Sequence, residues 1–214
     1  TVPEYIRLVA EADVVCIIGM ELEIGWMPKV LARSGNAKVQ AGGPGYCETG
    51  KNISVLEKPQ GQVDRSMGDI HAAGNPHFWL SPKVLAEAGV EIRNSLIRVD
   101  AAHTKEYQDN YTLFVEKMNK LHKEMAAKLA PHLAKTNGPF VIEYHREFTY
   151  FLNTYGIKSL GSIEEKPGVP PSAGRIAEIA IAAKNQGIKV AFGGAYAPHK
   201  IMERFSAVSY THLT

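Results

Sequence analysis

Two histidines in this sequence have neighbours that would hold an imidazole ring rigidly. The first is His77, in the run Asn-Pro-His-Phe-Trp-Leu-Ser-Pro at residues 75–82. Pro76 fixes its own φ, and Ser81 with Pro82 suits the start of a helix, so the loop should enter that helix at a defined angle. A neutral imidazole held in this way is a good transition-metal ligand. A turn histidine satisfied by backbone hydrogen bonds is the alternative.

The second histidine, His145, follows an apolar stretch at residues 140–144 that is typical of a buried strand. Open α/β sheets bind ligands outside the carboxyl ends of their strands, which is where His145 is expected. Because side chains alternate along a strand, we predict that Glu143 shares a face with His145 and accepts its second ring N–H. Pairing of Glu143 with a lysine is the alternative.

Two more histidines lie in predicted loops. His71 comes shortly before His77, and His199 follows Ala197-Pro198. Each is expected to be a solvated loop residue, with contact to a metal as the alternative. The predicted metal ligands are therefore His77 and His145, and the auxiliary candidates are Glu143, His71 and His199.

The elements that would carry these residues alternate between helix and strand. Apolar residues at steps of three and four predict a long helix from Asp100 or Thr104 to about Leu129. We predict an α/β fold of two lobes, each with a mostly parallel sheet flanked by helices: lobe 1–100, linking helix 101–131 and lobe 132–214. The other predicted elements are helices 3–12, 23–32, 82–98, 148–153 and 173–185, strands 13–19, 38–40, 140–144 and 189–192, and loops 42–45, 58–74 and 161–171.

The composition of the chain argues against several kinds of function. The chain is 45% hydrophobic and 21% charged, with a net charge of +2, and no basic cluster is interleaved with aromatic residues, so nucleic-acid binding is not expected. No apolar run has the length of a membrane span, and the start lacks the order of a secretory signal. Because the sequence begins at Thr1-Val2-Pro3, close to a predicted helix, we interpret it as a fragment or processed form.

The cysteines do not indicate a compartment. Cys16 lies in an apolar run that is typical of a strand, and Cys47 lies in a glycine-rich stretch. Their spacing fits no zinc or redox motif, so two buried or idle thiols are expected. A disulfide between them is the alternative.

Four stretches, in order, resemble the zinc- and manganese-binding solute-binding proteins of bacterial ABC transporters. Residues 10–26 are similar to that family's EADLVV…G…LE.W stretch, and residues 75–82 to its (D/N)PH.WL.P loop. Residues 141–156 resemble the HxxFxYFxxxYG segment, and residues 168–179 the PGxxPSxxxIAEI stretch. The four segments together span most of the chain.

The resemblance implies two α/β lobes bridged by a long helix, with one metal in the cleft held by three nitrogen or carboxylate ligands and a last carboxylate. His77 matches the second ligand and His145 the third. The first ligand, a histidine before the EADLVV stretch, and the fourth, an Asp or Glu beyond Ala207, are expected to lie outside this chain. Residues 209–214 do not resemble the family.

The resemblance also implies a monomeric receptor, periplasmic or lipid-anchored at the outer face of the cytoplasmic membrane. It would capture a divalent metal and deliver it to an ABC permease, without catalysis. Histidine in the third position favours Zn(II), because imidazole suits zinc whereas Mn(II) is better served by oxygen. The alternatives are an adhesin on the same scaffold and a zinc hydrolase with Glu143 or Glu147 as general base, although no His-Glu-x-x-His or Gly-x-Ser-x-Gly motif is present.

Overall fold

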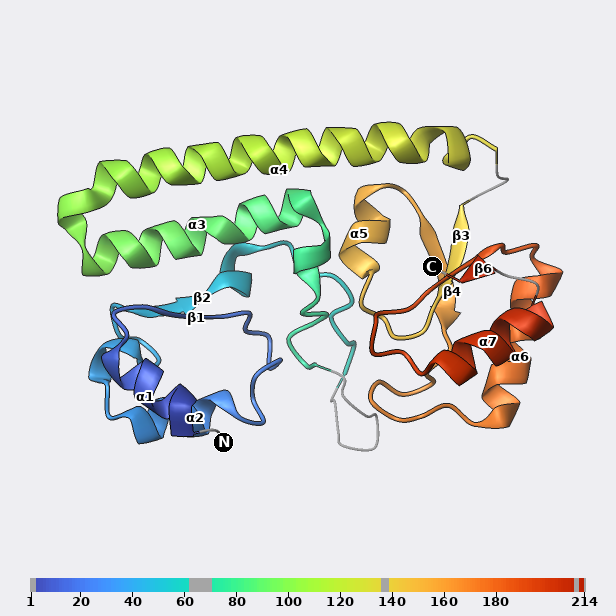
Figure 1. The fold of residues 1–214 in the computed structure, drawn as a ribbon, viewed down its shortest axis with the longest axis horizontal. Coiled ribbons are helices and arrows are strands. Elements are labelled where there is room, and N and C mark those ends of the chain that lie inside the picture. The colour runs from blue at the N-terminus through green and yellow to red at the C-terminus, as the bar shows by residue number, and fades with distance from the viewer. Residues whose placement is uncertain (1–2, 62–70, 136–138, 210–211, 214) are drawn as a thin grey trace. The chain divides into compact units, whose positions relative to one another are not determined.

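The computed structural model describes residues 3–61, 71–135, 139–209 and 212–213 (Figure 1). The chain divides into unit 1, Thr1–Lys58 with His71–Lys123, and unit 2, Pro59–Ile70 with Glu124–Thr214. The boundary lies inside helix α4 (Thr104–Leu133), so each unit contains part of this helix.

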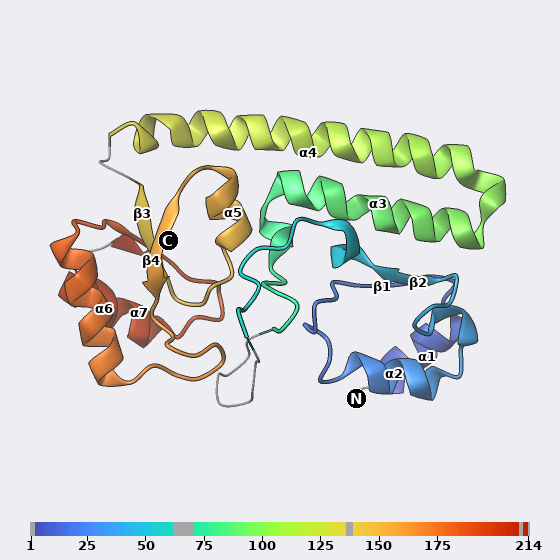
Figure 2. The ribbon, with the colours of Figure 1, turned by 180° about the vertical axis from the view of Figure 1, so that it is seen from behind.

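Unit 1 is built on a two-stranded parallel sheet of β1 (Val15–Ile17) and β2 (Tyr46–Glu48). Helix α3 lies along one side of this sheet, and α1 and α2 lie on the other, as Figures 1 and 2 both show. A small core of Val9, Val30, Leu31 and Val39 joins these two helices to the sheet. The remaining elements of unit 1 are α1 (Pro3–Glu11), α2 (Met27–Ser34), η1 (Ala37–Val39), η2 (Thr49–Asn52), η4 (Phe78–Leu80), α3 (Pro82–Val99) and η5 (Ala101–His103).

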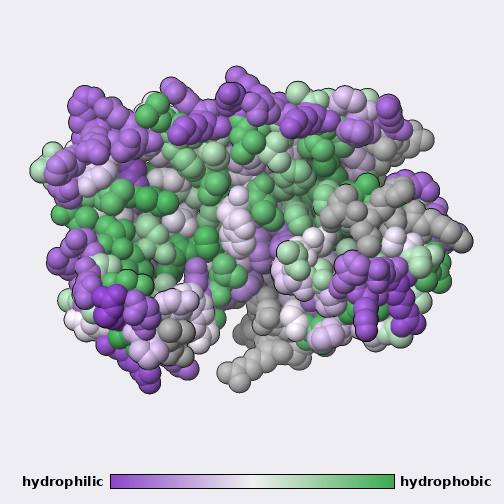
Figure 3. Space-filling model, in the orientation of Figure 1, coloured by the Kyte–Doolittle hydropathy of each residue, from purple (hydrophilic) through white to green (hydrophobic). Residues whose placement is uncertain are grey.

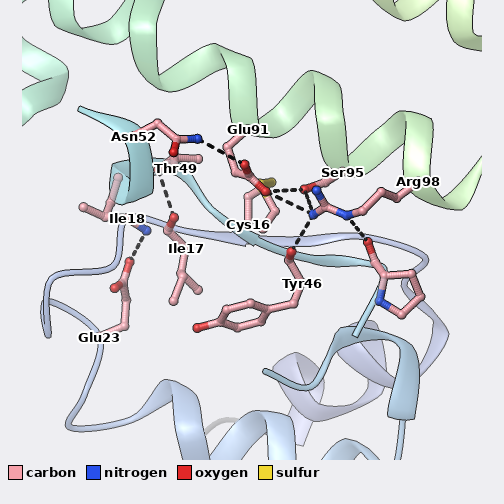
Figure 4. Close-up of a disulfide and its surroundings, with 12 residues drawn as sticks. Cys16, Ile17, Ile18, Glu23, Tyr46, Thr49, Asn52, Glu91, Ser95 and Arg98 are labelled. Carbon is pink, nitrogen blue, oxygen red and sulfur yellow. Dashed lines mark hydrogen bonds and ion pairs between the residues drawn. A yellow bond between two sulfur atoms is a disulfide. The ribbon is translucent and has the colours of Figure 1, made fainter. Parts of the chain in front are cut away.

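A disulfide joins Cys16 to Cys47 across the two strands (Figure 4). The expectation of two idle thiols was therefore wrong. The sequence pattern placed Cys47 in a loop, whereas strand β2 sets it directly opposite Cys16 in the parallel register. Cys47 is fully buried, whereas Cys16 is exposed as a residue.

Helix α3 is attached to β2 through Arg98, a half-exposed residue that pairs with a buried carboxylate (Figure 4). Nη2 of Arg98 lies 3.1 Å from Oε1 of Glu91, which is only 5% exposed. The same nitrogen donates to the backbone oxygen of Tyr46 at 3.0 Å, and Nε donates to the backbone oxygen of Pro44 at 3.1 Å. The charge of Glu91 is thus paired, and the helix that follows His77 is fixed to the sheet.

Unit 2 holds a four-stranded sheet in the order β4-β3-β5-β6, with every pair parallel. Consecutive residues of β3 point to opposite faces: Ile142 packs in a cluster with Ile179 and Phe205, and Val141 packs with Leu152. The elements are β3 (Phe140–Glu143), α5 (Thr149–Thr154), β4 (Lys158–Ser162), α6 (Ala173–Asn185), β5 (Val190–Phe192), α7 (His199–Ser209) and β6 (His212–Leu213).

Helix α4 is 30 residues long, and none of its residues is classed as buried. Hydrophilic side chains gather along it on the face drawn in Figure 3. In unit 1, a Cβ added at Gly89 of α3 would lie 3.0 Å from the Phe114 ring of α4, so a glycine permits this close helix packing. In unit 2, Met125 and Leu129 pack against the cluster around Leu152.

The predicted α/β architecture with parallel sheets is confirmed, and the long predicted helix is α4. Residues 38–40 were predicted as a strand, but Lys38 and Val39 belong to the 3₁₀ helix η1 and Gln40 directly follows it. The Asn36 side chain accepts from the Lys38 backbone N at 3.1 Å, which favours a turn. Strands β2, β4 and β6 and helix α7 were not predicted. Strand β4 covers 158–162, so the predicted loop 161–171 starts later than expected.

The helix predicted from residue 23 begins only at Met27. Glu23 accepts hydrogen bonds from the backbone N of Ile18 at 2.7 Å and of Gly19 at 3.1 Å. These bonds fold the chain back after β1, with Glu21 at a φ of 65°. The carboxylate thus stabilises turns where the apolar pattern predicted helix.

Candidate metal-binding residues

His77 lies in the segment of unit 1 that leads into helix α3, between two buried neighbours. Pro76 is fully buried and Phe78 is 1% exposed. A Cβ at Gly50 would lie 3.2 Å from Cε1 of Phe78, so the backbone of η2 packs closely against this ring. Ser81 then caps α3 with its side chain, as the sequence predicted. The loop around His77 is therefore held by the core below it and by the helix after it.

The ring of His77 is held by Asn75. Oδ1 of Asn75 accepts from the backbone N of His77 at 2.9 Å and lies 2.9 Å from its Nδ1. Asn75 is 9% exposed, so this contact is largely shielded from water. The ring of Trp79 lies 5.2 Å from the imidazole, centroid to centroid, at 50°. These contacts engage Nδ1 and restrict rotation of the ring.

His145 lies just past the carboxyl end of β3 in unit 2, where its Nδ1 is 2.7 Å from Oε2 of Glu164. Glu164 lies past the carboxyl end of the neighbouring parallel strand β4. The backbone hydrogen bonding between the two segments continues beyond the ends of β3 and β4, since the backbone N of Glu164 donates to the backbone oxygen of Tyr144 at 3.0 Å. The two side chains therefore meet at the strand-end edge where open α/β sheets bind ligands.

The surroundings of His145 are acidic and aromatic. The ring of Tyr196 lies 6.5 Å from the imidazole, edge to face. Burial and the carboxylate of Glu147 raise the pKa of Tyr196 far above its ordinary value. Burial and nearby Glu164 likewise raise the pKa of Tyr144, which is 3% exposed. Within the described residues, Oε1 of Glu147 is buried and has no hydrogen-bond partner, which leaves it able to accept one.

The auxiliary candidates lie in different settings. Glu143 is fully buried, and its Oε1 accepts from the backbone N of Phe148 at 3.0 Å. The predicted hydrogen bond from His145 to Glu143 stays a prediction. The carboxylate that contacts Nδ1 of His145 in the structure is that of Glu164. His71 is half-buried, and its backbone oxygen accepts from Gly74. His199 begins α7 with an 81% exposed side chain, 3.3 Å from Glu203.

Sequence reasoning missed Glu164. The glycine and serines of β4 hid the strand whose end positions this residue, so Glu164 was read as part of a loop. Recognising residues 158–162 as a strand parallel to β3 would have placed Glu164 beside His145. Asn75 belonged to the quoted motif, but its hydrogen bond to the ring depends on a side-chain rotamer that the sequence does not show.

Two features are absent from the described part of the chain. It contains no group of three or more His, Cys, Asp or Glu side chains arranged to hold a metal ion. None of its helices is both long enough and apolar enough to cross a membrane.

A family model, "Zinc-uptake complex component A periplasmic" (ZnuA), matches residues 1–209 of the chain. The chain belongs to this family. The predicted resemblance to metal-binding receptors of ABC transporters is thereby confirmed, and the ZnuA match ends where the sequence stopped resembling the family.

Individual relatives agree with the ZnuA family. The chain is 34% identical over 116 residues to "High-affinity zinc uptake system protein ZnuA" of Brucella abortus (strain 2308), an alignment that covers 54% of the chain and 34% of the relative. It is 31% identical over 157 residues to "Zinc-binding lipoprotein AdcA" of Streptococcus pneumoniae (strain ATCC BAA-255 / R6), covering 72% of the chain and 30% of the relative. These alignments thus span about a third of each curated relative.

The fold is shared with a solved member of the ZnuA family. The structure described as "Crystal structure of ZnuA" superposes with a TM-score of 0.78 at 23% identity, over 99% of this chain and 74% of that chain.

Proposed function

We propose that this chain binds Zn(II) as cargo, with His77 and His145 among the ligands, and serves an ABC permease that imports the metal. One observation carries this proposal. Each histidine has its Nδ1 engaged by a side-chain oxygen, that of Asn75 for His77 and that of Glu164 for His145. Outer oxygens of this kind orient a ligating imidazole and direct its Nε2 to the metal. Membership of the ZnuA family supports the same function.

The donor set favours zinc over manganese. Two imidazoles suit Zn(II), which is borderline soft, whereas Mn(II) prefers oxygen ligands. The Glu164 carboxylate that contacts Nδ1 of His145 strengthens this preference, because it makes the imidazole a better electron donor to the metal. Glu143, His71 and His199 are the auxiliary candidates within this chain.

The disulfide supports an extracytoplasmic location. Disulfides form and persist in oxidising compartments such as the periplasm, and thiols stay reduced in the cytosol. Cys16 and Cys47 are joined, and the structure contains no free cysteine among its described residues. The compartment named in the ZnuA family description is also the periplasm. We propose that the protein acts there or at the outer face of the cytoplasmic membrane, as a monomer.

A zinc titration tests the proposal. The parent chain, His77→Ala and His145→Ala are titrated by calorimetry at about pH 7.5, where imidazole is mostly neutral. His103→Ala is the matched control, because His103 is exposed and bonded to Asp100 in the η5 turn. We expect one-to-one binding in the parent, at least about tenfold weaker binding in both site variants, and parent-like binding in the control. Equal affinities in all four proteins would overturn the proposed site.

The proposal is for binding without turnover. The rival hydrolase would use the same histidines with Glu143 or Glu147 as general base. We therefore expect the zinc-loaded chain to leave a chromogenic ester intact, and hydrolysis that is lost in His145→Ala would contradict a pure receptor. Binding to a host matrix protein without metal would instead favour the adhesin alternative.

A further inference from the structure

A chain of hydrogen bonds connects Glu57 to His77 within unit 1. Oε2 of Glu57 accepts from Nδ2 of Asn75 at 2.9 Å. Oδ1 of Asn75 in turn contacts both the backbone N and the Nδ1 of His77, each at 2.9 Å. Glu57 lies outside the motif around His77, and it is separated from Asn75 by 18 positions in the sequence. The segment containing Glu57 is held next to the motif by a backbone bond from Asn75 N to Leu56 O at 2.9 Å.

The orientation of the Asn75 amide follows from these contacts. A backbone N–H can only donate, so the Asn75 atom that faces the His77 backbone N must be the oxygen. The same oxygen faces Nδ1 of His77, and a carbonyl oxygen can only accept, so Nδ1 must carry the hydrogen. A neutral imidazole has one N–H, so this tautomer leaves the lone pair on Nε2.

Glu57 stabilises this orientation from the other end of the amide. An ionised carboxylate only accepts, so it requires the NH₂ group of Asn75 to point towards it. A flipped amide would set oxygen against the carboxylate and NH₂ against both N–H groups of His77. The negative charge also polarises the amide, which makes Oδ1 a stronger acceptor for the Nδ1 hydrogen.

The backbone around Glu57 is shaped for this contact. Glu57 has a φ of 54°, in the left-handed region that residues other than glycine seldom adopt because it is sterically unfavourable. Gly74 has a φ of 112°, and a Cβ there would collide with the side chain of Val55. The two segments can approach only with glycine at this position. The unfavourable backbone conformation of Glu57 therefore occurs at the position from which its carboxylate reaches Asn75.

We infer that Glu57 is a positioning residue which, through Asn75, fixes His77 in the Nδ1–H tautomer and so presents Nε2 to the metal. This inference rests on the proposed zinc function for its purpose, but the tautomer can be measured without metal. An experiment can therefore contradict the inference about Glu57 without contradicting the proposed zinc function, and the reverse.

The test is nitrogen NMR of the ¹⁵N-histidine-labelled, metal-free chain at about pH 8, where imidazoles are neutral. Glu57→Ala removes the acceptor, and Glu57→Gln restores one through its amide oxygen. Glu21→Ala is the matched control. Glu21 also has a positive φ, of 65°, and its Oε2 accepts from the backbone N of Ala72 at 2.9 Å, but its recorded bond does not involve Asn75. The His145 signals report on unit 2 in every sample.

We expect the parent, Glu57→Gln and Glu21→Ala to show His77 as the Nδ1–H form. We expect Glu57→Ala to show a mixture of tautomers and several-fold weaker zinc binding, with unchanged His145 signals. Parent-like His77 shifts in Glu57→Ala, or an Nε2–H form in the parent, would overturn the inference. A tautomer shift in a chain that binds no zinc would leave the hydrogen-bond relay standing and refute the proposed function.

Discussion

The imidazole of His145 and the carboxylate of Glu164 meet at 2.7 Å although 19 positions separate them in the sequence. Adjacent parallel strands deliver both residues to the same sheet edge. His77 has an amide oxygen in the corresponding place. The Nδ1 atom of His145 therefore contacts a charged carboxylate, whereas that of His77 contacts a neutral amide. We expect His145 to be the stronger electron donor to a metal ion.

Glu164→Gln should weaken zinc binding by about 10- to 100-fold, because the neutral amide retains the shape of the carboxylate but lacks the negative charge that makes the ring a better metal ligand. The affinity is measured by competition with a fluorescent zinc indicator. Glu165→Gln is the matched control, since it makes the same change at the next, exposed position and should leave the affinity unchanged. Equal losses in both variants would point to net charge rather than to the contact with His145.

Loss of the disulfide should destabilise unit 1 without abolishing its fold. The bond closes a loop over a sequence separation of 31, for which the chain-entropy estimate is about 3.7 kcal/mol. The double substitution Cys16→Ser and Cys47→Ala should therefore lower the urea midpoint. Reductant should lower the parent midpoint in the same way and leave the variant unchanged. A parent midpoint that is insensitive to reductant, with the bond shown broken by thiol titration, would contradict this account.

Arg98→Ala should cost about 2 kcal/mol of stability, because Glu91 loses its cation and the backbone oxygens of Tyr46 and Pro44 lose their donor. Arg7→Ala is the comparison. Arg7 pairs with Glu4 and Glu11 on an exposed helix surface, where solvent and salt screen such pairs and they contribute little to stability. Urea denaturation of both variants measures the difference. Similar small effects would show that water solvates Glu91 more than its 5% exposure indicates.

Alkaline pH should destabilise unit 2 partly through Tyr144. Burial and nearby Glu164 raise the pKa of its hydroxyl in the folded state, so the folded chain holds this proton more tightly than the unfolded chain does. The resulting stability is complete below the ordinary tyrosine pKa of about 10 and is lost as the pH rises through the folded-state pKa. Tyr144→Phe cannot ionise, so its melting temperature should fall less than that of the parent between about pH 9 and 11. Equal falls in both proteins would exclude Tyr144 as the source.

The sequence predicted the elements with strong periodicity. Helices α3, α4 and α6 carry long apolar repeats, and Ser81 and Ser172 act as side-chain caps at the starts of α3 and α6. Strands β1 and β3 are apolar runs that end near glycine or charged residues. These local signals need no knowledge of distant residues, so pattern and capping rules recover them.

The missed features depend on contacts between distant segments. β2 is only a three-residue strand, Tyr46–Glu48, and it is stabilised by pairing with β1 and by Arg98 rather than by its own sequence. The partners of the candidate ligands follow the same rule. Glu164 reaches His145 through strand pairing, and Glu57 reaches Asn75 through a backbone conformation that propensities disfavour.

The bond between Cys16 and Cys47 also determines what happens to a nicked molecule. Helix α2 and the turns around it lie between the two cysteines. A protease that cleaves one peptide bond there produces two polypeptides that stay covalently joined, so the nicked protein keeps its full mass on a non-reducing gel and separates only after reduction. In a protease-rich environment outside the cytosol, a single cut between these cysteines therefore need not release either piece of the protein.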